Sequence, residues 1–155
     1  MQISRYAAIY INLGRCNRGA ADIVRQILNG SADIAKLFTG SWISTQTVVA
    51  MRTDVAAAAV RKAYKRGRLV FTHPSNVAGL EVGLSAHMDV LAHAIEDTRG
   101  LTADYLRRMI AQKMTLIPTL HLFAQDYNIE AIRQQVRSFS RPVVRFCSAP
   151  LWGLN

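Results

Sequence analysis

Several features that would assign this sequence to a class at once are scarce or missing. Only two cysteines, Cys16 and Cys147, occur in 155 residues, too few for a disulfide framework or a zinc knuckle. No run of about 18 apolar residues occurs, so we expect no transmembrane helix and no membrane partner. The first residues lack a clear apolar core and cleavage site of a signal peptide. We therefore predict a cytoplasmic protein whose cysteines are structural or incidental.

Acidic residues are also scarce. The sequence contains 10 Asp and Glu and 19 Lys and Arg, which gives a net charge of +9. Such an excess can indicate a nucleic-acid partner. However, the densest basic cluster, residues 61–68, covers the expected end of a helix, where cations suit the helix dipole. Tyr64 is its only aromatic residue, so bases would find no row of rings to stack on. We expect no specific nucleic-acid partner, and a basic nucleic-acid-binding α/β domain stays an alternative that rests on charge alone.

Apolar residues, in contrast, make up half of the sequence and follow a four-fold repeat of amphipathic helix, short turn and apolar strand. The expected helices span residues 20–30, 54–67, 77–86 and 102–112. The expected strands span residues 32–38, 68–73, 88–93 and 114–120. These strands are nearly continuous apolar runs, which is the pattern of parallel strands covered on both faces. The alternation predicts an α/β fold with a parallel sheet.

Two architectures satisfy this alternation: an open doubly wound sheet and part of a (β/α)8 TIM-type barrel. A complete barrel needs about 250 residues, so four units make about half of one. Local turn signals support the element boundaries. Gly30 and Gly67 fall where a left-handed residue ends a helix, and Thr102 is expected to cap the fourth helix.

In both architectures the chemistry lies at the carboxyl ends of the strands. The second expected strand ends in His73, the third ends in His93, and His121 follows the fourth, where it could face substrate. Neighbouring strands lie about 4.8 Å apart, so two imidazoles at one level can converge on one metal ion. Lys36 lies within the first apolar strand, where an amine is costly unless it is paired or modified. A hydrogen-bonded histidine or a lysine reaching toward solvent is the alternative for each position.

Three further polar residues lie at the opposite ends of the strands, which are usually structural. They are Asp33, His87 and Asp89. We therefore leave them out of the candidate site.

Taken together, the stretches ADIAKLFTGSW, RLVFTHPSN, MDVLAHAI and MTLIPTLHLF resemble the amidohydrolase superfamily. The similarity is to imidazolonepropionase-type and metal-dependent aminoacyl-proline dipeptidase-type members, and it runs from about Ala20 to Phe139. It implies a (β/α)8 barrel of which this chain covers roughly strands four to seven. It also implies one or two divalent metals, commonly zinc, that activate a water to hydrolyse carbon–nitrogen bonds. The implied substrates are small amides, cyclic amides or dipeptides.

The resemblance also implies roles for single residues. Lys36 matches the family's fourth-strand lysine, which is carboxylated by CO2 in binuclear members and bridges the metals. His73 matches the fifth-strand histidine ligand, and His93 matches the sixth-strand one.

Two parts of the family pattern are absent, namely the first-strand His-x-His pair and the eighth-strand Asp. No catalytic residue is therefore assigned, since residues 141–155 contain no carboxylate side chain. With suitable codons, Arg141 through Pro150 read one base earlier gives Ala-Gly-Gly-Glu-Val-Leu-Phe-Gly-Thr, close to the family's approach to strand eight. We accordingly expect an atypical segment 1–19, a partial barrel 20–140 and an atypical, frameshifted tail 141–155.

Two functional hypotheses follow from these observations. The first is a metal-dependent hydrolase of carbon–nitrogen bonds. The second is a truncated, inactive remnant of such an enzyme, whose exposed sheet edges favour association with other chains.

Overall fold

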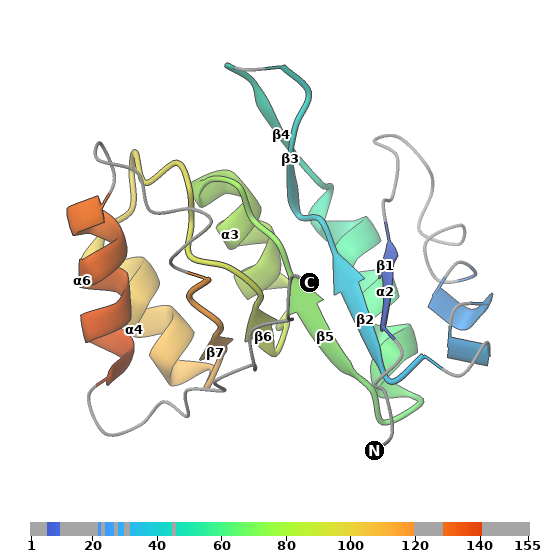
Figure 1. Cartoon of the computed structure of the whole chain (residues 1–155). Helices are drawn as coiled ribbons and strands as arrows, with labels where there is room; N and C mark the ends of the chain where they lie inside the picture. Colours follow the sequence, from blue (N-terminus) through green and yellow to red (C-terminus); the bar gives the residue numbers. More distant parts are fainter. Residues whose placement is uncertain are drawn as a thin grey trace, which may run out of the picture.

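Five short strands form one parallel sheet in the order β1-β2-β5-β6-β7 (Figure 1). The computed structural model describes residues 6–9, 22, 24–26, 28–29, 32–44, 46–119 and 129–140. The strands are β1 (Tyr6–Ile9), β2 (Ile34–Leu37), β5 (Leu69–Thr72), β6 (Val90–Leu91) and β7 (Thr115–Leu116). All neighbouring pairs are parallel. The predicted α/β class with a parallel sheet is confirmed, and the assignment of this sheet to part of a (β/α)8 barrel stays a prediction.

Helices separate successive strands, as the repeat predicted. They are α2 (Thr53–Tyr64), α3 (Val77–Ser85) and α4 (Ala103–Ala111), which precede β5, β6 and β7. Residues 22, 24–26 and 28–29 are helical within the first predicted helix. None of the helices that the structure describes is long and apolar enough to cross a membrane.

The turn signals have mixed outcomes. Gly67 has a φ of +62°, as predicted for the residue that ends α2, and Gly30 lies outside the described residues. Thr102 occupies the N-cap position of α4, but its side chain makes no capping hydrogen bond, so that prediction was wrong. Asp104 in the first turn stabilises this helix end instead, through the helix dipole.

Four described elements were not expected from the sequence. An antiparallel hairpin of β3 (Gly40–Trp42) and β4 (Val48–Ala50) follows β2 and rises beyond the carboxyl ends of β2 and β5 (Figure 1). Helix α6 (Ile129–Ser140) lies beside α4. Strand β1 falls within residues 1–19, and residues 141–155 lie outside the described part. The predicted segment boundaries stay predictions.

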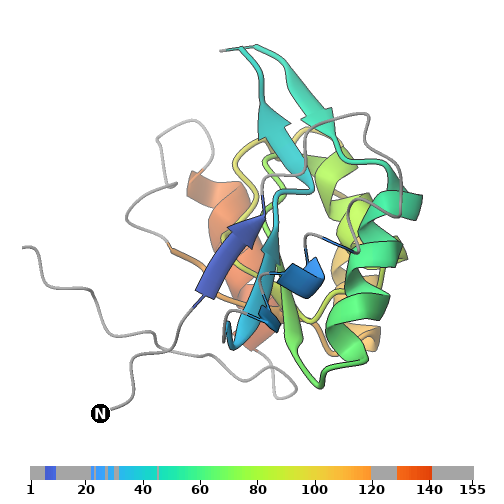
Figure 2. The same ribbon diagram turned by 90° about the vertical axis from the view of Figure 1, so that its right-hand side faces the viewer.

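The two faces of the sheet differ in burial. Ala35, Leu37 and Val70 are at most 1 % exposed and pack against the helices. Lys36 and Phe71 alternate with them, and so lie on the other face, where they are half-buried. Figure 2 shows α2 on one side of β2. Helix α2 contacts β2 and β5, and Lys36 lies on the face opposite to the buried Ala35 and Leu37. The expected cover of that second face stays a prediction.

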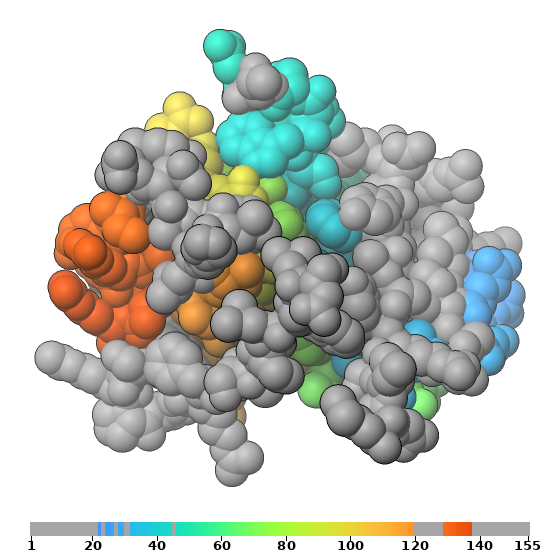
Figure 3. Space-filling model, in the orientation of Figure 1, coloured from blue at the N-terminus to red at the C-terminus, as the bar shows by residue number. Residues whose placement is uncertain are grey.

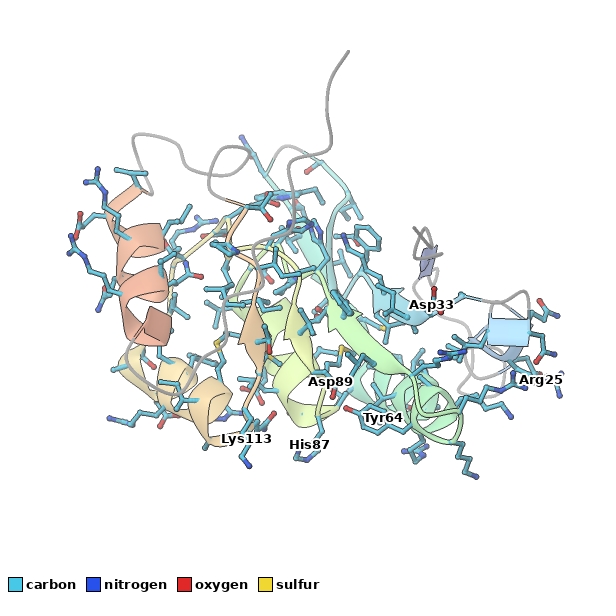
Figure 4. All side chains as sticks on the ribbon, turned by 60° about the horizontal axis from the view of Figure 1, so that its bottom comes forward. Arg25, Asp33, Tyr64, His87, Asp89 and Lys113 are labelled. Carbon is cyan, nitrogen blue, oxygen red and sulfur yellow. The ribbon has the colours of Figure 1, made fainter. Side chains whose placement is uncertain are left out.

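The amino ends of the strands carry a polar cluster of their own (Figure 4). The Tyr64 hydroxyl donates to Oδ1 of Asp89 at 3.0 Å and to the carbonyl oxygen of His87. The Val70 N–H donates to Oδ2 of Asp89 at 2.7 Å. Burial, followed by the contact with Asp89, raises the pKa of Tyr64. This cluster joins α2 to β5 and β6 at the end of the sheet opposite to His73 and His93.

Candidate functional site

Lys36, His73 and His93 come together at the carboxyl ends of three neighbouring strands. Lys36 lies in β2, His73 directly follows β5, and His93 lies two residues beyond β6. The Nζ atom of Lys36 is 3.1 Å from Nε2 of His93. The two imidazole rings have centroids 4.7 Å apart and planes at 72°. The structure thus brings together the three residues predicted as metal ligands, and His121 lies outside the described residues.

The two histidines do not stand at the same level of the sheet. Thr72 pairs with Leu91 in the register of β5 and β6, so His93 lies one residue further along than His73. The ladder extends to Ala92, whose N–H donates to the Thr72 carbonyl oxygen at 2.9 Å. His93 follows directly, and its ring contacts that of His73 in spite of the offset.

His93 is hydrogen-bonded through both ring nitrogens. Its Nδ1 lies 2.9 Å from Oγ1 of Thr119, and its Nε2 faces Lys36. Burial, then the positive charge of Lys36 and the neighbouring His73, lower the pKa of His93 to about 4. The ring is therefore neutral at pH 7. Its Nε2 then accepts from the Lys36 ammonium and its Nδ1–H donates to Thr119, which fixes one tautomer.

Thr119 holds a strained backbone conformation next to His93. Its φ is +44°, in the left-handed region that a β-branched residue rarely adopts. Residues held this way cluster at functional sites. Sequence reasoning missed Thr119, although its position just after Pro118, at the end of the fourth expected strand, was a usable signal. Its hydroxyl orients the imidazole of His93.

Burial also affects the amine of Lys36. Its pKa lies below the ordinary lysine value because the side chain is half-buried. The Nζ atom also lies 5.3 Å from the ring centroid of Phe38, a position in which an aromatic face attracts a cation. The amine therefore sits between a neutral imidazole and an aromatic ring.

His73 is held by a carboxylate and an aromatic ring. Oε1 of Glu96 lies 3.6 Å from Nε2 of His73, and the Trp42 indole N–H donates to Oε2 of Glu96 at 2.8 Å. Burial raises the pKa of Glu96, but the contacts with His73 and Trp42 outweigh it, so the net shift is downward. Phe38 stacks on His73 at a centroid distance of 4.8 Å. Sequence reasoning missed Glu96, although it lies three residues after His93.

Two glycines allow the loop that carries His73 to pack closely. A Cβ atom on Gly79 would lie 2.9 Å from the backbone nitrogen of Gly40, closer than side-chain carbons approach. The Ser75 hydroxyl donates to the Gly40 carbonyl oxygen at 3.1 Å, and the Asn76 side chain accepts from the Gly79 N–H at 2.9 Å. The loop after His73 is thereby fixed between the start of β3 and the first turn of α3.

The loop that carries His93 and Glu96 is fixed from the other side by α6. Gln135 is 1 % exposed. Its side-chain oxygen accepts from the Ile95 N–H at 3.1 Å, and its amide nitrogen donates to the Ile95 carbonyl oxygen at 3.5 Å. The buried Gln135 amide therefore pairs with both backbone polar groups of Ile95, which lies between His93 and Glu96 in the sequence.

A cavity of about 330 Å3 opens beside Glu96. Its described lining residues are Trp42, Glu96, Asp97, Thr98 and Arg99. Figure 3 shows atoms of the hairpin next to those of the loop after β6, coloured cyan and yellow. Arg99 donates to both carboxylate oxygens of Asp97, at 2.8 and 2.6 Å, so these two charges largely cancel.

The donor chemistry fits a divalent metal in part. Two imidazole nitrogens are ordinary zinc ligands, and Lys36 would serve as a third donor only when neutral or carboxylated. No three His, Cys, Asp or Glu side chains of the described residues are grouped to hold a metal ion. The described residues therefore provide a partial donor set in which the lysine is essential.

Comparison with solved structures shows where this fold recurs. The chain resembles a Xaa-Pro dipeptidase with bound methionine in the active site, at 15 % identity and a TM-score of 0.63, covering 84 % of this chain and 37 % of that one. A molinate hydrolase matches at 14 % identity and a TM-score of 0.61, covering 83 % of this chain and 29 % of that one. The A. niger ochratoxinase matches at 12 % identity and a TM-score of 0.60, covering 81 % of this chain and 30 % of that one.

These likenesses show a shared fold. The chain spans about a third of the length of these solved structures, since it covers 29–37 % of them. No family model matches the chain, and a search of curated proteins finds no matching sequence. The fold is therefore similar to a part of enzymes that are named as peptidases and hydrolases.

Proposed function

We propose that this chain supplies part of the active centre of a metal-dependent hydrolase that cleaves carbon–nitrogen bonds in amides, cyclic amides or peptides. The observation that carries the proposal is the convergence of Lys36, His73 and His93 at one end of a parallel sheet. Nζ of Lys36 lies 3.1 Å from Nε2 of His93, and the two imidazole centroids are 4.7 Å apart. In α/β folds this end of the sheet carries the chemistry.

In this proposal His73 and His93 hold a divalent metal, zinc in the first instance, together with Lys36. Carboxylation of Lys36 joins its neutral amine nitrogen to the carbon of CO2 and releases one proton. The product is an anionic oxygen donor in place of a half-buried cation. When bound, the metal acts as a Lewis acid and lowers the pKa of a coordinated water.

Other side chains orient these ligands. Thr119 holds Nδ1 of His93, which leaves Nε2 directed at Lys36. Such second contacts fix the tautomer and ring orientation of a ligating histidine. Glu96, held by the Trp42 indole, does the same for His73.

The named solved structures support this proposal at the level of reaction class. The chain shares its fold with a Xaa-Pro dipeptidase and with a molinate hydrolase. The candidate ligands lie at the carboxyl ends of the strands, where α/β folds carry their chemistry. We therefore propose small amides and dipeptides as the substrates.

A second candidate is an inactive remnant of such an enzyme. It is favoured by the absence of any group of three His, Cys, Asp or Glu suited to a metal among the described residues. The remnant keeps the fold and the Lys36–His93 contact but hydrolyses nothing.

Hydrolysis assays separate the two candidates. Purified chain, supplied with zinc and bicarbonate, is incubated with Xaa-Pro dipeptides and cyclic amides. The hydrolase is supported if the parent forms product, if a chelator or the substitution His93→Ala abolishes product formation, and if His87→Asn leaves it intact. Asn suits that control because His87 has a φ of +57°, which Asn tolerates. Folded chain without product rejects activity of this chain and favours the remnant.

A further inference from the structure

The cavity beside Glu96 has the features of a binding site for one part of a ligand. Its volume of about 330 Å3 lies near the lower end of the range of roughly 300–1,000 Å3 for small-molecule pockets. It opens next to the carboxylate that contacts His73, and His73 contacts His93. A ligand group in the cavity would thus lie beside the candidate site rather than in it.

Trp42 gives this cavity an aromatic wall. Trp42 is 41 % exposed, and its indole N–H already donates to Glu96 at 2.8 Å. That bond fixes the orientation of the ring and leaves its flat face as the part that a ligand can contact. Aromatic groups stack on such faces with a gain beyond simple area burial.

The charges of the cavity disfavour an anionic ligand. Two carboxylates, Glu96 and Asp97, face one guanidinium, Arg99. Arg99 is committed to Asp97 through two hydrogen bonds, so its guanidinium is already engaged by a carboxylate.

We propose that the cavity bounded by Trp42, Glu96 and Arg99 binds an uncharged planar ring, such as the aromatic side chain of a peptide or amide substrate. The statement that this ring belongs to a substrate rests on the proposed function. Binding of the ring itself is independent of hydrolysis. The ring stacks on Trp42, and the amide beside it extends toward His73 and His93.

The experiment measures binding without turnover. The chain contains two tryptophans, Trp42 and Trp152, so Trp152→Phe makes Trp42 the only indole fluorophore. This protein is titrated with phenylacetamide, with propionamide as the probe that lacks a ring, and with 4-carboxyphenylacetamide as the anionic ring. We expect saturable quenching by phenylacetamide, none by propionamide, and at least about fivefold weaker binding of the anionic probe.

Paired substitutions isolate the stacking. Trp42→Phe and Trp42→Leu both remove the indole N–H that binds Glu96. Trp42→Phe keeps an aromatic ring at this position, whereas Trp42→Leu does not. By calorimetry, phenylacetamide should bind Trp42→Leu at least about fivefold more weakly than Trp42→Phe. Ile43→Ala, which changes a neighbouring side chain that is 61 % exposed, should bind as the parent does.

Equal affinity for phenylacetamide and propionamide would overturn the inference, as would equal binding by the Leu and Phe variants. If neither variant folds, the Trp42 fluorescence titration decides alone. Ring-selective binding in a chain that hydrolyses nothing supports the ring-binding cavity and rejects the proposed hydrolase function. Hydrolysis without ring-selective binding supports the hydrolase function and rejects the ring-binding cavity.

Discussion

Nζ of Lys36 lies 3.1 Å from Nε2 of His93, although 57 positions separate these residues in the sequence. The contact links β2 to the end of β6 across the intervening strand β5. Both pKa values fall below their ordinary range, that of Lys36 through burial and that of His93 through burial and then the lysine charge. The lysine charge therefore favours the neutral imidazole of His93, while burial favours loss of the proton from Lys36.

Removing the lysine charge should raise the pKa of His93. In Lys36→Met we expect a value above the parent's value of about 4 and still below 6.5, because burial, the larger cause, remains. The measurement is a titration of the His93 ring by 15N-detected NMR. Lys113→Met, at the opposite end of the sheet (Figure 4), is the control and should leave the value unchanged. A parent value near 6.5 would contradict this description of the site.

The same low pKa predicts loss of stability in mild acid. Between pH 6.5 and about 4, the unfolded chain binds a proton at His93 that the folded chain does not. The free energy of unfolding should therefore fall as pH decreases through this window. Each pKa unit corresponds to about 1.4 kcal/mol. Because the His93 ring is partly exposed, solvent screening reduces the full value that the pKa shift would give. We therefore expect a loss of roughly 1–2 kcal/mol in the free energy of unfolding.

Urea unfolding at pH 7.5, 6.5, 5.5 and 4.5 measures this dependence. His93→Gln should flatten it, because the group that protonates only in the unfolded chain is gone. The pKa of Glu96 is also lowered from 4.5, which adds a loss of the same sign below pH 4.5 that persists in the variant. An identical slope for parent and variant between pH 6.5 and 4.5 would reject the assignment.

Thr119 should control metal affinity through the tautomer of His93. Thr119→Ala removes the hydroxyl 2.9 Å from Nδ1, and loss of such an orienting contact typically weakens metal binding about 10–100-fold. Thr119→Ser retains the hydroxyl and should bind metal as the parent does. Zinc dissociation constants from competition with a chromophoric chelator test this pair. Equal constants for Ala and Ser would mean that the hydroxyl does not orient the ring.

Gln135 should be a sensitive position of α6. Gln135→Ala leaves the N–H and C=O of Ile95 without their side-chain partners. An unsatisfied buried polar group costs about 1–3 kcal/mol, so we expect a loss of about 2–4 kcal/mol in the free energy of unfolding. Arg133→Ala, at an exposed neighbouring position with only a surface ion pair to Glu130 in the described residues, should change it by less than about 1 kcal/mol. Similar losses in both variants would show that helix propensity, not the clamp on Ile95, is responsible.

The alternation of helix and strand was predictable because it depends on local spacing. The apolar runs around Ala35, Val70 and Leu91 are all strands of one parallel sheet, in the order that the repeat implies. Helix α6 follows the same rule, since Ile129, Ile132 and Val136 recur at spacings of three and four. It could have been predicted from the sequence and was missed.

The hairpin β3–β4 was not predictable in the same way. Its strands are three residues each, too short to show a period. Its position depends on Gly40, which packs against the backbone of Gly79 from a helix almost forty residues later. Contacts of this kind are set by tertiary packing, which local patterns do not encode.

Part of the candidate site was predictable and part was not. Lys36, His73 and His93 were found because polar residues at the ends of apolar strands stand out in the sequence. Glu96 and Thr119 lie in loops, and their roles depend on which ring nitrogen each one faces. That information exists only once the strands are placed side by side, so sequence spacing alone could not supply it.

The central claim, that Lys36, His73 and His93 form a metal site, is tested most directly by the amount of zinc bound per chain. Folded protein, checked by circular dichroism, is dialysed to equilibrium with zinc and bicarbonate and analysed by elemental mass spectrometry. We predict about one zinc per chain in the parent and in His87→Asn, and loss of that zinc in His73→Ala and in His93→Ala. A folded parent without zinc, or the same zinc content in all four proteins, would contradict the claim.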